Sequence, residues 1–360
     1  MFVAWRDLRF AKGRFALMGT VIVLITLLVG LLSGLTAGLG RQNVSAITSL
    51  PADRIAFGAT GELSYSNSTV TEPQWRQWST VPGVTAAEPL GITTTRADAG
   101  DTKAAVSAFG VRPGSPLAPE SHRLGHDTVV LSITAADELG VAAGGKVTLA
   151  GKPATVAAVR GDVSFSHTPV IWTSLGFWQA TAPPTGTSEG PRATVVALTT
   201  SGTSAADTEA ADRSLGTTTV TLDESLSAIG SYTAENGSLQ LMRGFLFAIS
   251  ALVIGAFFTV WTIQRSGDIA VLKALGASTR SLLKDALGQA VVLLTCGTLL
   301  GTAIAAGLGA LIAGTVPFVL DPATVLVPAL VMIALGALGA ALSLRRITAV
   351  DPLTALGSAR

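Results

Sequence analysis

The chain has 360 residues, of which 49% are hydrophobic and 13% are charged, and its formal net charge is +1. Soluble domains carry about 25% charged residues, so this composition indicates a membrane protein. A net charge close to zero gives no reason to expect nucleic acid as a partner. The single cysteine excludes an intrachain disulfide.

Four apolar stretches are long enough to cross a bilayer, which takes about 20 residues. In chain order they cover residues 15–36, 241–263, 287–312 and 324–344. We predict a membrane α-helical protein with four transmembrane helices and a mixed α/β extracellular domain inserted between helices 1 and 2, at residues 38–240. A cleaved signal peptide is the alternative for the first stretch, although its apolar run is longer than usual for such a peptide.

Lysine and arginine residues gather in the segments on one side of these stretches. The N-terminal segment 1–14, the loop 264–286 and the tail 345–360 are basic, whereas the short turn between the third and fourth stretches has no basic residue. Short basic segments stay in the cytoplasm. We therefore expect a multi-pass protein of the cell membrane with both termini cytoplasmic.

The segment between the first two helices is expected to alternate strands with short helices. "TVVLSITAADELGV" and "TPVIWTSLGFWQA" each predict a strand followed by a helix, and "GKVTLAGKPATVAAV" predicts two strands around a turn. "GVAAGGKV" (140–147) approaches a phosphate-binding loop but has Val147 where such a loop needs a hydroxyl, so we expect a hairpin turn there. The histidines His122, His126 and His167 are expected to be ordinary surface residues. The chain has no credible nucleotide or catalytic site, so it is not expected to be an enzyme.

The polar stretch "RSGDIAVLKALGAST" (265–279) predicts a short helix that does not cross the membrane. Ser266 is a suitable N-cap, and Gly276 is a suitable end. Ile269, Leu272 and Leu275 give the helix an apolar side. This pattern alone fits both a simple connector and a docking surface for a cytoplasmic partner.

This loop and the closing segment "RRITAVDPLTAL" resemble the corresponding segments of FtsX/MacB-type ABC transporter permeases, and the order of helices and outer domain is similar too. The resemblance implies a dimer of this chain that works with separate ABC ATPase subunits, which bind the ATP. It also implies that the loop and an amphipathic N-terminal segment, residues 1–14, transmit ATPase movement to the outer domain. The residues implied in this coupling are Asp268, where glutamate is commoner, and Ile269, Lys273, Leu275 and Gly276.

The short outer domain and "DVSFSHTPVIWTSLGFWQ" resemble the haem-exporting subgroup of these permeases, which implies haem as a transported substrate and no intrinsic cofactor. Glu235 and Met242 share one helix face and are candidate ligands of haem iron. Candidate partners of the haem propionates are Tyr232, Arg243 and Arg41, and Tyr232 could ligate the iron instead. Gly30, Gly34 and Gly38 recur every four residues, which fits either a slot for a planar amphiphile or close helix packing in a dimer.

Other interpretations of these residues remain open at this stage. Glu235 and Arg243 would be solvated at the membrane surface, and Met242 would pack, if no ligand binds there. The chain would then be a mechanotransmitting regulator of an extracellular cell-wall enzyme, or an exporter of a lipid, peptide or antibiotic. Membrane lipid is an expected partner in every case.

Overall fold

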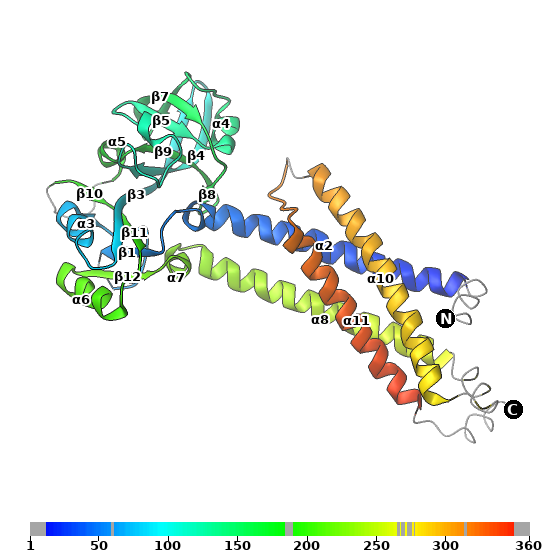
Figure 1. Ribbon diagram of the computed structural model, residues 1–360. Helices are drawn as coiled ribbons and strands as arrows, with labels where there is room; N and C mark the ends of the chain where they lie inside the picture. The colour runs from blue at the N-terminus through cyan, green and yellow to red at the C-terminus, as the bar shows by residue number, and fades with distance from the viewer. Residues whose placement is uncertain are drawn as a thin grey trace. The chain divides into compact units, whose positions relative to one another are not determined.

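The structure is a computed structural model that describes residues 12–58, 61–183, 190–264, 267, 271, 276, 278–312 and 315–348. The chain divides into two compact units (Figure 1). One contains Met1–Gly38 together with Ser238–Arg360, and the other contains Leu39–Gly237. We call them the helical unit and the α/β domain.

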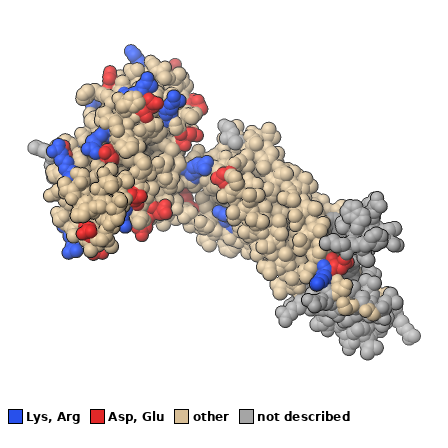
Figure 2. All heavy atoms as spheres, in the orientation of Figure 1, with Lys and Arg blue, Asp and Glu red and all other residues tan. Residues whose placement is uncertain are grey.

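The helical unit is built from four long helices, and each has the length and apolar composition to cross a membrane, with a mean hydropathy of 2.0 to 2.5 over its best window. They are α2 (Lys12–Thr48), α8 (Tyr232–Gln264), α10 (Thr279–Ile312) and α11 (Pro322–Thr348). The predicted fold class is therefore confirmed. The visible face of these helices carries few charged side chains, whereas charges are scattered over the α/β domain (Figure 2).

All four helices extend beyond the apolar stretches from which they were predicted, and α2 and α8 do so at the ends that join the α/β domain. The helix α2 runs on to Thr48, and α8 already begins at Tyr232, so both continue into the α/β domain. Apolar composition marks only the part of a helix that meets lipid, and polar residues such as Asn43 and Glu235 extend the same hydrogen-bonded ladder. The helices are therefore longer than the apolar stretches that hydropathy identifies.

Small residues allow the helices of the helical unit to approach closely. A Cβ atom added to Gly301 on α10 would lie 2.7 Å from the carbonyl oxygen of Val23 on α2, and one added to Gly339 on α11 would lie 3.3 Å from Cα of Gly255 on α8. Backbone approach of this kind is how helices associate in lipid. The side chains buried between the helices include Met18, Ile22, Val29, Ile254, Phe258, Trp261, Leu294 and Met332.

The α/β domain contains twelve described strands and five short α-helices. The strands are β1 (Arg54–Gly58), β2 (Val70–Thr71), β3 (Val84–Ala99), β4 (Thr102–Val111), β5 (Thr128–Leu131), β6 (Lys146–Leu149), β7 (Lys152–Val159), β8 (Ser164–Phe165), β9 (Thr168–Ser174), β10 (Arg192–Ala193), β11 (Val195–Thr200) and β12 (Thr217–Thr221). The helices are α3 (Glu72–Trp78), α4 (Ile133–Leu139), α5 (Leu175–Thr181), α6 (Ala205–Leu215) and α7 (Leu222–Ser225).

The main sheet follows the order β12-β1-β11-β3-β4-β9-β5-β7-β6, and β6 pairs with β3 as well. The six strands β3, β4, β9, β5, β7 and β6 therefore close into a ring. The strand β3 has 16 residues and connects this ring to the rest of the sheet. Its first half pairs with β11, which lies outside the ring, and its second half pairs with β4, which lies in it. The strand β8 lies outside this order and pairs only with β9 among the described strands.

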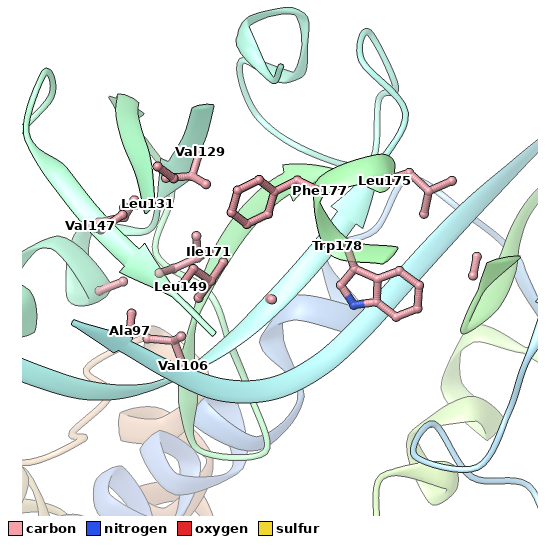
Figure 3. Close-up of a cluster of buried hydrophobic side chains, with 14 of the residues drawn as sticks. Ala97, Val106, Val129, Leu131, Val147, Leu149, Ile171, Leu175, Phe177 and Trp178 are labelled. Atoms are coloured by element: carbon pink, nitrogen blue, oxygen red, sulfur yellow. The ribbon is translucent and has the colours of Figure 1, made fainter. Parts of the chain in front are cut away.

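Apolar side chains fill the closed part of the sheet and continue under α4 and α5. Figure 3 draws 14 of them and labels ten, Trp178 among them. A Cβ atom added to Gly91 or Gly110 would overlap the Trp178 side chain, so these strand glycines provide the room for the indole. The labelled residues are Ala97, Val106, Val129, Leu131, Val147, Leu149, Ile171, Leu175, Phe177 and Trp178.

The strand and helix patterns read from the sequence of the domain are confirmed at β5–α4, β6–β7 and β9–α5. Serine caps start the two helices: Ser132 accepts from the backbone nitrogen of Ala135, and Ser174 accepts from that of Phe177. The prediction of a hairpin turn at 140–147 is wrong. Gly140 ends α4 in a left-handed conformation, and the following residues connect α4 to β6, because a glycine after a helix favours the C-cap.

The distribution of basic residues generates a prediction of sidedness. We expect a cysteine at the exposed position Ser201 to react with a membrane-impermeant maleimide on intact cells, and one at the exposed position Ser278 to react only after permeabilisation. Both variants are made with Cys296→Ser, which removes the native thiol. Labelling at Ser278 but not at Ser201 would contradict the orientation.

Candidate functional site

The hairpin between β8 and β9 turns through two residues with unusual backbone conformations. Phe165 and Thr168 are paired across the hairpin, and the two residues between them, Ser166 and His167, have φ values of 48° and 65°. Hairpin turns of this kind favour Asn-Gly, and a non-glycine residue in the left-handed region costs about 1 kcal/mol or more. Two side chains are therefore retained at positions where glycine would be easier to accommodate.

Aromatic rings hold the base of this hairpin in place. Phe165 is buried and meets Tyr65 edge to face with ring centroids 5.5 Å apart, and it meets Phe109 in the same way at 5.7 Å. Edge-to-face pairs add about 0.5–1.5 kcal/mol beyond the burial of apolar area. These contacts anchor the strand residue next to the strained turn.

The last turns of α2 bind the same hairpin through backbone and side-chain hydrogen bonds. Ser166 N donates to the carbonyl oxygen of Asn43 at 2.9 Å, and His167 N donates to that of Gln42 at 3.1 Å. Ser164 N donates to Oγ of Ser45 at 2.8 Å. The two backbone nitrogens of the turn are therefore paired with carbonyl groups in the last two turns of α2.

Glu235, near the start of α8, completes this cluster. Nε2 of His167 lies 2.7 Å from Oε2 of Glu235, and Nδ2 of Asn43 donates to the same oxygen at 3.0 Å. Oγ of Ser231 donates to Oδ1 of Asn43 at 3.0 Å and lies 3.3 Å from Oγ of Ser166. An ionised carboxylate only accepts hydrogen bonds, so Nε2 of His167 carries the proton. We call these five residues the His167–Glu235 cluster.

The sequence-predicted ligand residues lie at several places in this structure. Tyr232 is partly buried against the core of the α/β domain, and Arg41 is exposed at the end of α2. Met242, with 46% of its surface exposed, and the partly buried Arg243 lie further along α8. The side chain of Glu235 is hydrogen-bonded to His167 and Asn43. Neither of these two residues belongs to the predicted set.

The glycine row of α2 is filled from within the same chain. A Cβ atom added to Gly30 would lie 2.9 Å from Cβ of Ala305 on α10. One added to Gly34 would overlap the ring of Phe318, and one added to Gly38 would overlap the carbonyl group of Pro317. The sequence analysis predicted either a ligand slot or packing in a dimer. In the structure, the connection between α10 and α11 of the same chain packs on the row instead. The backbone nitrogen of Val319 also donates to the Gly34 carbonyl oxygen at 3.1 Å.

The sequence analysis missed His167 and Asn43. His167 was expected to be an ordinary surface histidine, and this is wrong because its side chain is only 30% exposed and contacts Glu235. A signal was present in "SFSHTP", since two strand-like pairs flank Ser-His where a two-residue turn normally carries glycine or asparagine. Asn43 left no signal, because it follows an apolar run as many helix-ending residues do.

The coupling residues Asp268, Ile269, Lys273 and Leu275 lie outside the residues that the structure describes. Gly276 is described, is exposed, and has a φ of 92°. This conformation favours glycine. Its role in coupling stays a prediction.

The packing of the glycine row can be tested by adding one methyl group. We expect Gly34→Ala to lower the free energy of unfolding by about 1–3 kcal/mol through overpacking against Phe318, measured by thermal unfolding of the full chain in detergent. Adding Phe318→Ala should recover part of this loss, since the two sites are in contact. Gly40→Ala is the matched control, because a Cβ there meets nothing within 4 Å. Equal effects of Gly34→Ala and Gly40→Ala would contradict the contact.

Comparison with known proteins agrees with this architecture. Residues 15–215 match the MacB-like periplasmic core domain, and residues 241–352 match the FtsX-like permease C-terminal domain. The chain is 24% identical to a hemin transport system permease protein, HrtB, of Staphylococcus epidermidis, over 99% of both chains. It is 27% identical to an uncharacterized ABC transporter permease of Mycobacterium tuberculosis, again over 99% of both.

A solved structure, the extracellular domain of the noncanonic ABC-type transporter YknZ, aligns with 47% of this chain and 98% of its own, at 12% identity and a TM-score of 0.35. The family assignment rests on the two domain matches, of which the MacB-like match covers more than half of the chain. Permeases of this kind work with an ATPase subunit and are not catalytic themselves. The chain belongs to the FtsX/MacB family of ABC-type permeases.

Proposed function

We propose that this permease, driven by a partner ATPase, exports haem or a closely similar planar amphiphile from the membrane. Two features support the substrate. The relative named as a hemin transport permease covers 99% of the chain, and the residue pattern offers oxygen and sulfur ligands at the outer end of α8. Identity to that relative is 24%, so the substrate needs a direct test.

The proposal rests mainly on the position of the Glu235 carboxylate. Its side chain is 43% exposed although two neighbours hold it through one oxygen. A carboxylate that is oriented and still accessible is suited to bind a metal centre. Met242 is the second candidate ligand, since it lies seven positions further along α8 and 46% of its surface is exposed.

The cationic and phenolic groups near these candidates would serve the charged edge of the substrate. Arg243 is on α8 beside Met242, and Arg41 is exposed near the end of α2. Arginine binds carboxylates through two parallel hydrogen bonds, which is the chemistry that a propionate requires. Tyr232 would add one hydroxyl donor from the first turn of α8.

A planar ligand would reach the glycine row only if the connection between α10 and α11 moved. Phe318 and Pro317 occupy the space beside Gly34 and Gly38. We infer that Gly30, Gly34 and Gly38 serve packing within the chain. A second copy of the chain is part of the proposal, and a central site would then take Glu235 or Met242 from either copy.

Haem binding can be measured by titrating the full chain in nanodiscs with Fe(III) protoporphyrin. We expect Glu235→Gln and Met242→Leu each to shift the Soret band, because a change of axial ligand changes the electronic environment of the iron, and Glu235→Gln to weaken binding roughly tenfold or more.

The matched controls for this titration are Glu209→Gln, on an exposed helix of the α/β domain, and Leu241→Ala, the exposed neighbour of Met242 on α8. Both should leave the spectrum unchanged. An absence of saturable change in the unmodified protein would contradict haem as substrate and would favour a lipid, a peptide or a regulatory role. Saturable binding with identical spectra in all variants would show that residues other than Glu235 and Met242 ligate the iron.

Coupling to the ATPase is proposed for the loop that contains Asp268, Ile269, Lys273, Leu275 and Gly276. We expect Ile269→Asp to place a charge on its apolar side and Gly276→Pro to disturb its end. In proteoliposomes with the ATPase, both should reduce transport several-fold while hydrolysis continues. Ser281→Ala, an exposed position on α10, is the control. Unchanged transport in both variants would argue against docking at this loop.

A further inference from the structure

The carboxylate of Glu235 is held in an asymmetric way. Both described hydrogen bonds, from Nε2 of His167 at 2.7 Å and from Nδ2 of Asn43 at 3.0 Å, end on Oε2. Within the part of the chain that the structure describes, Oε1 has no hydrogen-bond donor, and the side chain is 43% exposed. One oxygen therefore fixes the group, and the other is left to accept a ligand.

The two donors are themselves fixed. Asn43 is oriented by Ser231, whose hydroxyl donates to Oδ1 at 3.0 Å, so its amide nitrogen is turned toward Glu235. His167 is oriented by the hairpin, whose backbone nitrogens at 166 and 167 bind carbonyl groups of α2. Held donors of this kind keep a ligating carboxylate in one geometry.

The strained turn supports the same assignment. Ser166 and His167 both occupy the left-handed region, with φ values of 48° and 65°. Such conformations persist where the surrounding contacts over-determine them, and they gather at functional sites. A turn that only had to reverse the chain would be more stable with glycine at one of these positions, whereas the imidazole is what reaches Glu235.

We propose that His167 and Asn43 are positioning residues that present Oε1 of Glu235 as the ligand of a metal centre. This role rests on the proposed function, because the metal is the iron of the transported porphyrin. His167 and Asn43 touch the carboxylate rather than the substrate. Their hydrogen bonds restrict the Glu235 side chain to the rotamer that presents Oε1 to the substrate. Less conformational entropy of this side chain is then lost when the substrate binds.

The test compares two porphyrins that differ only in the metal. The full chain in nanodiscs is titrated with Fe(III) protoporphyrin, followed by the Soret band, and with metal-free protoporphyrin, followed by fluorescence. We expect His167→Ala and Asn43→Ala to weaken binding of the iron porphyrin by about 10- to 100-fold, the usual effect of losing the partner of a ligand. Binding of metal-free protoporphyrin should not change, since it has no iron for Oε1.

Two further variants separate the hydrogen bond from the turn. His167→Gln retains a nitrogen donor at about the distance of Nε2, and it should restore most of the affinity and the unshifted Soret band. His167→Asn tolerates the left-handed backbone but is too short to reach Glu235, and it should behave like His167→Ala. His126→Gln, an exposed histidine outside the cluster, is the control.

A second measurement reports the contact without any porphyrin. The chain has three histidines, so the imidazole nitrogen resonances of the ¹⁵N-histidine-labelled protein can be assigned with His167→Gln. Glu235→Gln should shift the His167 resonance and leave those of His122 and His126 in place. An unshifted His167 resonance would overturn the positioning role.

The titrations also distinguish the two levels of the proposal. If the unmodified protein binds neither porphyrin, the proposed function fails, and this role fails with it. If the unmodified protein binds the iron porphyrin but His167→Ala and Asn43→Ala bind it equally well, the substrate stands and the positioning role is wrong. Equal weakening toward both porphyrins would show a purely structural effect and would also overturn it.

Discussion

One carboxylate oxygen joins three segments of the chain. Oε2 of Glu235 accepts hydrogen bonds from His167, in the β8–β9 turn, and from Asn43, near the end of α2, while Glu235 itself lies in the first turns of α8. The ends of two membrane helices and one hairpin of the α/β domain therefore depend on the same small set of bonds. Bonds to a charged acceptor are the stronger ones, which suits a contact that must fix three backbones at once.

This contact explains why a strained turn is retained. The left-handed residues Ser166 and His167 destabilise the hairpin, and three sets of interactions offset that cost. The aromatic pairs of Phe165 hold its base, the backbone nitrogens of the turn bind α2, and the imidazole binds Glu235. His167→Gly would relieve the backbone strain of the turn but would remove the hydrogen bond to Glu235. The stability of the turn therefore favours glycine at position 167, whereas the His167–Glu235 cluster requires histidine.

Much of the fold could be predicted from the sequence because its signals are local. Apolar runs gave the four helices, and alternation with turn residues gave pairs such as β6–β7. The site could be predicted only in part. Glu235 stood out as a charge at the start of an apolar helix, but its partners are 68 and 192 positions away, and no spacing rule links residues across such distances. The glycine row predicted either a ligand slot or packing in a dimer, but its spacing carries no information about the groups that lie beside Gly34 and Gly38, which are Phe318 and Pro317 of the same chain.

The long strand β3 has a mechanical consequence. Its second half is paired with β4 at nine successive positions, and its first half with β11. Antiparallel ladder bonds lie across the strand direction, so tension along β3 loads many of them simultaneously in shear instead of opening them one after another. The shared strand therefore makes the domain resist stretching along the direction of β3.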